Sequence, residues 1–402
     1  MAPVWDAFLK LLGTALGNES AAPMPELTAQ QWSELCSLAG AHKVLPLVFE
    51  PAYPLISRAD PALAAAMKQQ VRRLVIGQTL RSAEFLELYR ALEEAGATPL
   101  VVKGIVCRQL YPHPDHRPSA DEDLLIPPEQ FELCHRAMEA QGLRACGPLD
   151  SYEIPYRKPG SALYIELHKA LFPPESAAYG DLNGFFPDPF GSAAVQPVSG
   201  GSVHTLEPGN HLTYLLFHAF KHFLHSGFGI RQVCDILLFT RANAGCIDFD
   251  AVAKSCRAIR AEKFAGAVFA IGTRHLGFEP MGTWPETAEL PLLEDVLRAG
   301  IYGSAERSRQ HSSTITLQAV AARKQETSDR RGVLAAAFPA SKDLEDRYPW
   351  LKKQPYLVPI AWADRMTGYL RETLRRPDNS LADTLKLGAE RKKLLRQYDI
   401  LD

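Results

Sequence analysis

Three acidic residues stand at the head of a short apolar run, in the order Asp121, Glu122 and Asp123 before Leu124 and Leu125. Side chains alternate along a strand, so we expect Asp121 and Asp123 on one face and Glu122 on the other. Two carboxylates on one face can bind the same cation, and such hard oxygen ligands suit magnesium. The spacing is therefore compatible with a magnesium site at the start of a strand, and equally with a pair of strand-end carboxylates that face water.

Basic residues that could neutralise phosphate oxygens precede these acids. Lys103 and Gly104 follow a first apolar run over residues 99–102, and Arg117 lies in the loop before the acidic run. A glycine turn at the start of a helix lets backbone N–H groups approach a phosphate. An arginine can bind a phosphate bidentately. Strand, glycine turn, helix, loop and acidic strand together favour phosphate chemistry.

A third acid lies downstream in residues 163–168, where apolar and polar residues alternate as they do in a strand. The alternation places Tyr164, Glu166 and His168 on one face. Glu166 and His168 are therefore candidates for a site on that face. His168 could orient Glu166 or contact a phosphate.

A row of histidines marks the helix that we expect from Asn210, as its cap, to about residue 224. The row and the lysine beside it comprise His211, His218, Lys221, His222 and His225. The spacing of His218 and His222 at i and i+4 is that of a helical zinc site, to which His225 could add a ligand. No glutamate stands between them in the arrangement typical of a metalloprotease.

Two other interpretations of these histidines stay open. They could line a substrate cleft, with Lys221 and Arg231 as phosphate contacts. They could also belong to a buried network with Asp235, which lies one helical turn from Arg231 and could pair with it.

Together the motifs resemble the nucleotidyltransferase superfamily that includes DNA polymerase beta, and more closely its uncharacterised bacterial branch. The matching segments are Lys103-Gly104, Tyr111-Pro112-His113-Pro114, Arg117 through Leu125, and Glu166-Leu167-His168. The resemblance is specific over roughly residues 98–170 and extends more weakly to about residue 240. The superfamily motif has Gly-Ser at the turn, whereas Ile105 stands at the serine position in this chain.

The resemblance implies an enzyme that transfers a nucleoside monophosphate from a triphosphate such as ATP, with release of pyrophosphate. The acceptor would be a hydroxyl or phosphate of a small molecule, a protein or an RNA end. It also implies a two-metal magnesium site with Asp121, Asp123 and Glu166 as catalytic ligands, although Glu166 could instead be the general base. The residues expected to bind the nucleotide are Lys103, Gly104, Arg117, His168, His218, Lys221, His222 and Arg231.

Three alternatives remain beside this hypothesis. The first is a protein that binds nucleotides but has lost catalysis, because the turn lacks the serine. The second is a hydrolase with a metal site formed by the histidines of the later helix. The third is an interaction protein, such as a toxin or antitoxin partner.

The composition is that of an ordinary globular protein, with 46% hydrophobic residues, 22% charged residues and a formal net charge of -2. The near-neutral charge argues against a long nucleic acid as acceptor. Seven scattered cysteines without CxxC spacing indicate reduced thiols. The N-terminus lacks a secretion signal, and no apolar run approaches the roughly 20 residues that span a bilayer. We therefore expect a cytoplasmic protein with no membrane partner.

The pattern of elements around the motifs predicts an α+β fold. We expect a small mixed β-sheet, the nucleotidyltransferase core, between an N-terminal helical layer and a C-terminal helical domain. The expected boundaries are residues 1–95, 96–205 and 206–402. Within the first region, Thr28 should cap one helix, and Pro61 should open a long helix over residues 62–95.

Overall fold

The computed structural model describes residues 2–299 except 19–22, 175, 177 and 226, together with residues 320, 344, 348–352, 354–364 and 381–401. The helices before the first strand are α1 (Pro3–Ala15), α2 (Ala29–Ala41), α3 (Leu45–Ala59) and α4 (Pro61–Glu94). Thr28 caps α2 and exchanges hydrogen bonds with Gln31 in a capping box. Asp60 caps α4, and Pro61 occupies its first turn, where a missing N–H costs nothing. Both predicted helix starts are confirmed.

The central sheet is mixed and has the strand order β1-β2-β5-β4-β3. Its strands are β1 (Leu100–Val101), β2 (Glu122–Leu125), β3 (Arg144–Ala145), β4 (Glu153–Arg157) and β5 (Tyr164–His168). Strands β2 and β5 run parallel, and the other neighbours are antiparallel. A separate antiparallel hairpin follows, formed by β6 (Ala194–Val198) and β7 (Gly201–Thr205).

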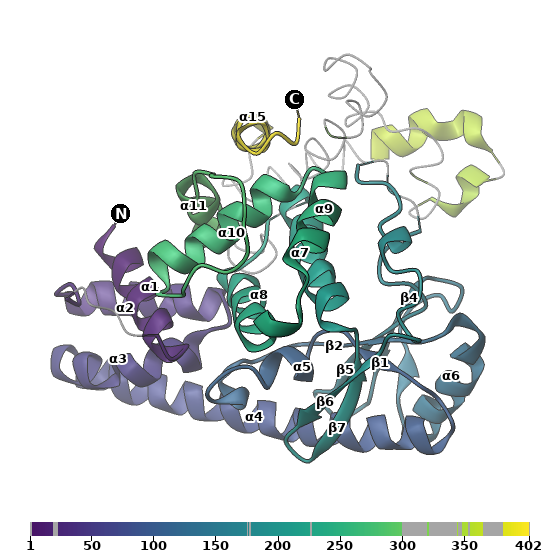
Figure 1. Ribbon diagram of the computed structural model, residues 1–402, viewed down its shortest axis with the longest axis horizontal. Coiled ribbons are helices and arrows are strands. Elements are labelled where there is room, and N and C mark those ends of the chain that lie inside the picture. Colours follow the sequence, from purple (N-terminus) through teal and green to yellow (C-terminus); the bar gives the residue numbers. More distant parts are fainter. Residues whose placement is uncertain are drawn as a thin grey trace.

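Alternation along the strands separates an apolar face of the sheet from a polar one. Leu124, Ile165 and Leu167 belong to a core that also contains the second half of α4 and the helix α6 (Phe131–Ala140). Asp123 and Glu166 take the intervening positions and face the other way. Helix α4 passes beneath the sheet, while α7 (Pro208–Leu224) and α8 (Ile230–Asn243) lie above it (Figure 1).

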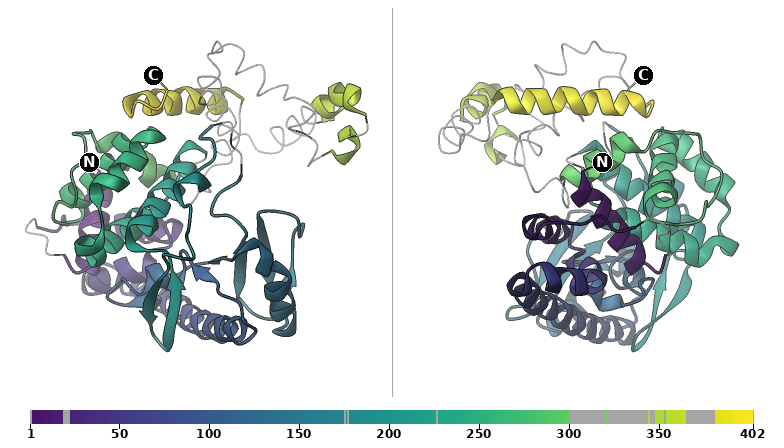
Figure 2. Two further views of the ribbon diagram at one scale, coloured as in Figure 1. Left: turned by 45° about the vertical axis from the view of Figure 1, so that its right-hand side comes forward. Right: turned by 90° about the vertical axis from the view of Figure 1, so that its left-hand side faces the viewer.

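The helices after the sheet share one hydrophobic core with the N-terminal helices, which contains Phe8, Leu35, Phe217 and Phe264. These later helices are α9 (Phe249–Ala258), α10 (Glu262–His275), α11 (Leu290–Ala299) and α15 (Leu381–Gln397). In Figure 2, α15 lies across the outer side of this helical part. The hydroxyl of Tyr398, just beyond α15, accepts a hydrogen bond from Leu292 N–H. The structure confirms the predicted α+β fold.

Some predicted elements are shorter than the sequence pattern indicates. The apolar run over residues 99–102 forms a strand only at residues 100–101, and the helix expected after the glycine turn is the short α5 (Ile105–Arg108). The cap of α7 is Glu207 rather than Asn210, because the Glu207 carboxylate accepts from Gly209 and Asn210 N–H. Short 3-10 helices span Pro114–His116, Pro128–Gln130, Asn183–Phe185, Ala244–Cys246, Pro349–Lys352 and Pro355–Leu357.

Most of residues 300–380 lies outside the described part of the chain, including much of the predicted C-terminal helical domain. The three expected domain boundaries stay a prediction. Among the helices that the structure describes, none has both the length and the apolar character needed to span a membrane.

Candidate active site

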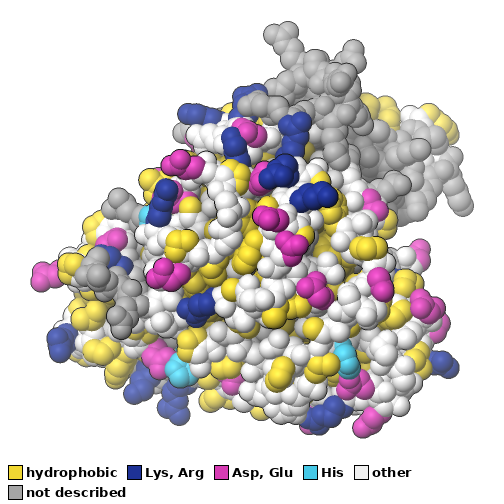
Figure 3. Space-filling view, viewed as in Figure 1, with side chains coloured by type: hydrophobic (Ala, Val, Ile, Leu, Met, Phe, Trp, Pro, Cys, Tyr) yellow, Lys and Arg dark blue, Asp and Glu magenta, His cyan; other side chains and the backbone are white. Residues whose placement is uncertain are grey.

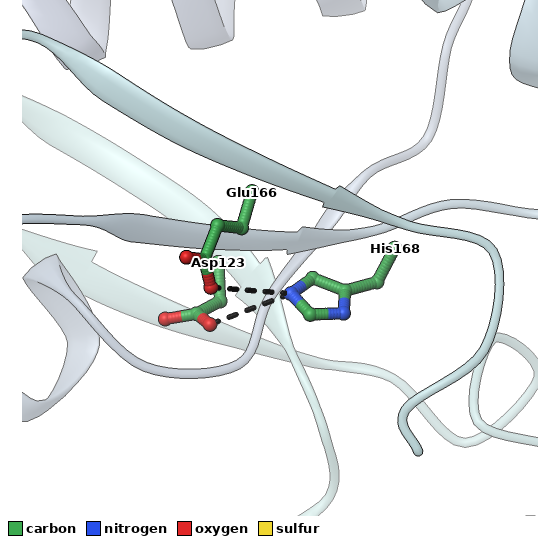
Figure 4. Close-up of side chains that lie close together, drawn as sticks. All are labelled: Asp123, Glu166 and His168. Carbon is green, nitrogen blue, oxygen red and sulfur yellow. Dashed lines mark ion pairs between the residues drawn. The ribbon is translucent and has the colours of Figure 1, made fainter. Parts of the chain in front are cut away.

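Parallel pairing of β2 with β5 brings two of the predicted acids together. Asp123 stands opposite Glu166 in the strand register, and Leu125 stands opposite His168. Since residues two apart share a face, His168 follows Glu166 on the same side of the sheet. Figure 4 shows Asp123, Glu166 and His168 pointing toward one another from these two strands.

These three side chains form a group that one metal ion could join. Their ligand atoms all lie within 4.8 Å of one another. His168 Nε2 is 3.4 Å from Asp123 Oδ1 and 3.9 Å from Glu166 Oε2. Within the described residues, no other group of three His, Cys, Asp or Glu side chains meets this condition. Asp121 is not part of the group, although it lines the same cavity.

Lys103 connects the acids to the histidines of α7. Its Nζ lies 3.2 Å from Asp123 Oδ2 and 3.2 Å from His218 Nε2. His222 Nε2 lies a further 3.3 Å from His218 Nε2. The predicted cleft interpretation of the histidines is therefore favoured by the geometry, because His218 and His222 face the sheet carboxylates across a cavity.

The cavity between the sheet and α7 has a volume of about 250 Å³. Its acidic wall comes from the sheet side, with Asp121, Asp123, Glu153 and Glu166, beside His168. The facing wall comes from α7, with Tyr214, His218, Lys221 and His222, and Lys103 also lines the space. His218 follows Tyr214 by four residues, and Lys221 and His222 follow His218 by three and four residues, which places them on one helical face.

Sequence reasoning missed three residues that line this cavity. Glu153 begins β4 and stands opposite His168 in the strand register, with its Oε2 3.9 Å from His168 Nδ1. Tyr214 lies one turn before His218 on α7, and Leu171 follows β5. Helical spacing from His218 was a signal for Tyr214, whereas nothing local indicated that β4 would pair with β5.

Burial and charge give the two paired carboxyl groups opposite protonation. Burial would raise the pKa of Asp123, but the Lys103 ammonium and the nearby His168 imidazole outweigh it and hold that pKa well below its usual range. Burial raises the pKa of Glu166 to about 8, and the charges of Asp123 and Asp121 add to this effect. At neutral pH Asp123 is therefore ionised, whereas Glu166 is largely protonated.

The histidines on α7 are neutral in this environment. Burial lowers the pKa of His218 well below its usual range, and the charges of Lys103 and of the neighbouring His222 add to the effect. Burial likewise lowers the pKa of His222, with a further contribution from Lys221. A neutral imidazole can accept a hydrogen bond, which suits the position of His218 beside the Lys103 ammonium.

The remaining histidines of the row do not reach the cavity. His211 is fully buried and lies 2.8 Å from the Val102 carbonyl oxygen and 3.1 Å from Thr205 Oγ1. His225 is the residue that ends α7. Among the described residues, the row of histidines forms no metal-binding group of three, so the geometry gives the histidine-metal hydrolase no support.

The backbone at the glycine turn contacts a side chain of the protein, Glu122, in the place where a phosphate was expected. Gly104 has φ of 55°, and a Cβ atom there would lie 1.8 Å from Glu122 Oε2. Glu122 accepts a hydrogen bond of 2.7 Å from Ile105 N–H and forms an ion pair of 2.5 Å with Arg108. As expected, Glu122 faces away from Asp123. Its carboxylate accepts the hydrogen bond from the first N–H of α5, which was expected to bind a phosphate.

Two arginines expected to bind phosphate have structural partners instead. Arg117 is 2% exposed and donates from Nε and Nη2 to the Asp235 carboxylate, at 2.6 Å in both cases. Arg231 is also buried and donates to the Pro118 carbonyl oxygen. Neither arginine lines the cavity. The expected pairing of Arg231 with Asp235 is wrong, because Asp235 binds the more distant Arg117.

Several buried polar atoms around the carboxylates fit a divalent cation. Asp123 Oδ2 and both ring nitrogens of His168 are buried and have no hydrogen-bond partner among the described residues, although charged groups stand nearby. Buried polar groups are normally hydrogen-bonded, and a bound ion or water would satisfy these atoms. Carboxylate oxygens suit magnesium, and imidazole is also a common orienting partner of ligating carboxylates. The donor set therefore fits a magnesium ion held by carboxylates.

The comparison with protein families agrees with this geometry. Residues 28–277 match the family described as uncharacterised nucleotidyltransferase. This match covers more than half of the chain, so the protein belongs to that family of nucleotidyltransferases. No curated protein and no solved structure matches the chain. The family match includes the sheet, α7 and α8, and thus all elements that line the cavity.

Proposed function

We propose that this protein is a magnesium-dependent enzyme that transfers a nucleoside monophosphate from a nucleoside triphosphate to an acceptor hydroxyl or phosphate. The acceptor oxygen, which gives up its proton to solvent where it is a hydroxyl, forms a bond to the α-phosphorus, while the bond from that phosphorus to the pyrophosphate oxygen breaks. Pyrophosphate leaves with the electron pair of the broken bond. The proposal is carried by the convergence of Asp123, Glu166 and Lys103 in one cavity of a nucleotidyltransferase family member.

Charge balance explains why such a cavity requires a cation. Four carboxyl groups line it, one of them the largely protonated Glu166, against two lysine ammonium groups. A nucleoside triphosphate is strongly anionic, and the carboxylates alone would repel it. Asp121, Asp123 and Glu166 would hold the ions. When bound, magnesium neutralises charge on the attacking and leaving oxygens of the displacement.

The side chains around these ligands have distinct roles in the proposal. His168 orients the Asp123 and Glu166 carboxylates. Its Nε2 lies 3.4 Å from Asp123 Oδ1 and 3.9 Å from Glu166 Oε2. Lys103 and Lys221 face the triphosphate oxygens as point charges. His218, being neutral, positions the Lys103 ammonium. Most of the rate would come from this positioning and from electrostatic stabilisation.

The substitution Asp123→Asn tests the proposal because it keeps the shape of the side chain and removes its charge. With magnesium and a triphosphate labelled at the α-phosphate, we expect the wild-type protein to label a molecule in cell extract and to release pyrophosphate. The variant should lose both activities by about 100-fold or more. Asp150→Asn is the matched control, because Asp150 is exposed and outside the cavity. Full labelling by a folded Asp123→Asn protein would refute the assignment.

One observation favours a second function, nucleotide binding without transfer. Ile105 N–H donates its hydrogen bond to Glu122, so this donor is not available to the triphosphate. Calorimetry with magnesium and ATP, run beside the pyrophosphate assay, separates the two functions. Binding of the nucleotide without release of pyrophosphate in any extract would support the second function over the first.

A further inference from the structure

A second cavity lies on the N-terminal side of the acidic run. It has a volume of about 320 Å³ and is bounded by α2, by α4 and by the segment Pro118–Ala120. Three cationic side chains line it, from Lys43, Arg73 and Arg81. We call it the basic cavity. The N-terminal helices, which the sequence predicts as a layer beside the sheet, thus also form a wall of this cavity.

The charge of the basic cavity is unbalanced. None of the described residues that line it is acidic. On the face of the molecule drawn in Figure 3, by contrast, acidic and basic side chains are interspersed. Burial lowers the pKa of Lys43, the charges of Arg231 and Arg81 add to this effect, and the charge of Asp121, which lines the acidic cavity, opposes it. Three cations gathered around one space repel one another, and a bound anion would relieve that repulsion.

The fold fixes the Arg81 side chain and the Lys43 backbone at the edge of this cavity. Arg81 donates from Nη1 to the Ser119 carbonyl oxygen and, at 3.2 Å, to Gln78 Oε1. Its Nε is buried and has no hydrogen-bond partner within the described part of the chain. Lys43 has φ of 51° because it follows α2 in a Schellman turn, in which Val44 N–H donates to the Ala39 carbonyl oxygen. This turn fixes the backbone from which the Lys43 side chain extends.

One peptide bond joins a residue that lines the basic cavity to a residue that lines the acidic cavity. Ala120 lines the basic cavity, and Asp121, the next residue, lines the acidic one. The acidic cavity needs cations before it can accept a phosphate, whereas the basic cavity does not. The two cavities thus suit two different anionic molecules that meet near Asp121.

We propose that the basic cavity binds a phosphate group of the acceptor, so that the acceptor is a phosphate-bearing molecule. The acceptor role rests on the proposed nucleotidyl transfer, whereas phosphate binding by Lys43, Arg73 and Arg81 does not. Lys43 and Arg73 contact the phosphate as adjustable charges, and Arg81 adds the charge of its fixed guanidinium. The donor triphosphate occupies the acidic cavity with its magnesium ions.

Calorimetry with the full-length protein and inorganic pyrophosphate in EDTA tests the binding step. EDTA removes the cations that the acidic cavity requires, so that only a metal-independent site can respond. We expect Lys43→Gln and Arg73→Gln each to weaken pyrophosphate binding about tenfold, the size of one charge-assisted hydrogen bond. Arg72→Gln is the matched control, because Arg72 is the neighbouring exposed arginine on α4 and does not line the cavity.

Equal weakening by Arg72→Gln and Arg73→Gln, or no pyrophosphate binding by the wild-type protein, would overturn the proposal. Asp123→Asn should keep pyrophosphate binding in EDTA even if it loses nucleotide transfer, which separates this proposal from the proposed function. Binding of ATP with magnesium then distinguishes acceptor from donor. Unchanged ATP binding in Lys43→Gln and Arg73→Gln supports an acceptor site, whereas a parallel loss would show that the basic cavity holds the donor triphosphate.

Discussion

Arg117 and Asp235, 118 positions apart in the sequence, form a buried ion pair with two hydrogen bonds of 2.6 Å. The Tyr111 hydroxyl donates to the same carboxylate at 2.8 Å. These contacts attach the loop before β2 to helix α8. The loop leads directly into Asp121 and Asp123, so the ion pair fixes the position of the segment that precedes these two acids.

Removal of one partner of this ion pair should destabilise the protein strongly. Asp235→Ala leaves the Arg117 guanidinium buried without its counter-charge, and we expect a loss of about 3–5 kcal/mol in the free energy of unfolding. Urea unfolding followed by circular dichroism measures it. Glu294→Gln is the control, because its pair with Arg298 is 52% and 63% exposed and should contribute less than about 1 kcal/mol. Equal effects of the two substitutions would contradict the prediction.

The same substitution at two glycines should have opposite effects on stability. Gly104→Ala introduces a Cβ at 1.8 Å from Glu122 Oε2 in a left-handed backbone, and we expect a loss of about 2 kcal/mol or more. Gly77→Ala in α4 meets no atom within 4 Å and should stabilise the helix by about 0.5–1 kcal/mol. Thermal unfolding of both variants checks the signs. A neutral Gly104→Ala would show that Glu122 does not constrain the turn.

Metal binding should depend on pH through Glu166. Burial, with the charges of Asp123 and Asp121, raises the pKa of Glu166 to about 8 in the metal-free protein, so the group is protonated at pH 7. A cation must displace this proton, and magnesium affinity should therefore rise about tenfold per pH unit below about pH 8 and level off above it. Calorimetry in buffers of different ionisation enthalpy measures how many protons are released when magnesium binds.

The Glu166→Gln variant is the control for this dependence. It has no proton to release at that position, and its weaker magnesium binding should vary much less between pH 6.5 and 8. An identical pH dependence in the variant and the wild-type protein would show that another group is displaced.

Alternation in short strands was enough to predict the face shared by Glu166 and His168 and the opposite orientation of Glu122. Helical spacing similarly predicted that His218, Lys221 and His222 would share a face. Which strands pair is a non-local property, so the arrangement of Asp123 beside Glu166 was implied by the resemblance to a family rather than by the local pattern.

The partners of buried charges could not be read from local spacing. Arg231 and Asp235 stand one helical turn apart, which suggested a pair, yet Asp235 binds Arg117 from a distant loop. Arg108 and Glu122 form a similar buried pair across 14 positions. In each case the carboxylate binds an arginine that tertiary packing places beside it, and one-dimensional spacing carries no information on that packing.

The parallel register of β2 and β5 makes the acidic cavity tolerant of some insertions and intolerant of others. Added residues in the connection between these strands, such as the turn from β3 to β4, leave Asp123 opposite Glu166. One residue added inside β2 reverses every side chain that follows it, because alternation has a period of two. Leu124 and Leu125 would then exchange faces of the sheet, so a change of loop length leaves the site in place whereas a change of strand length does not.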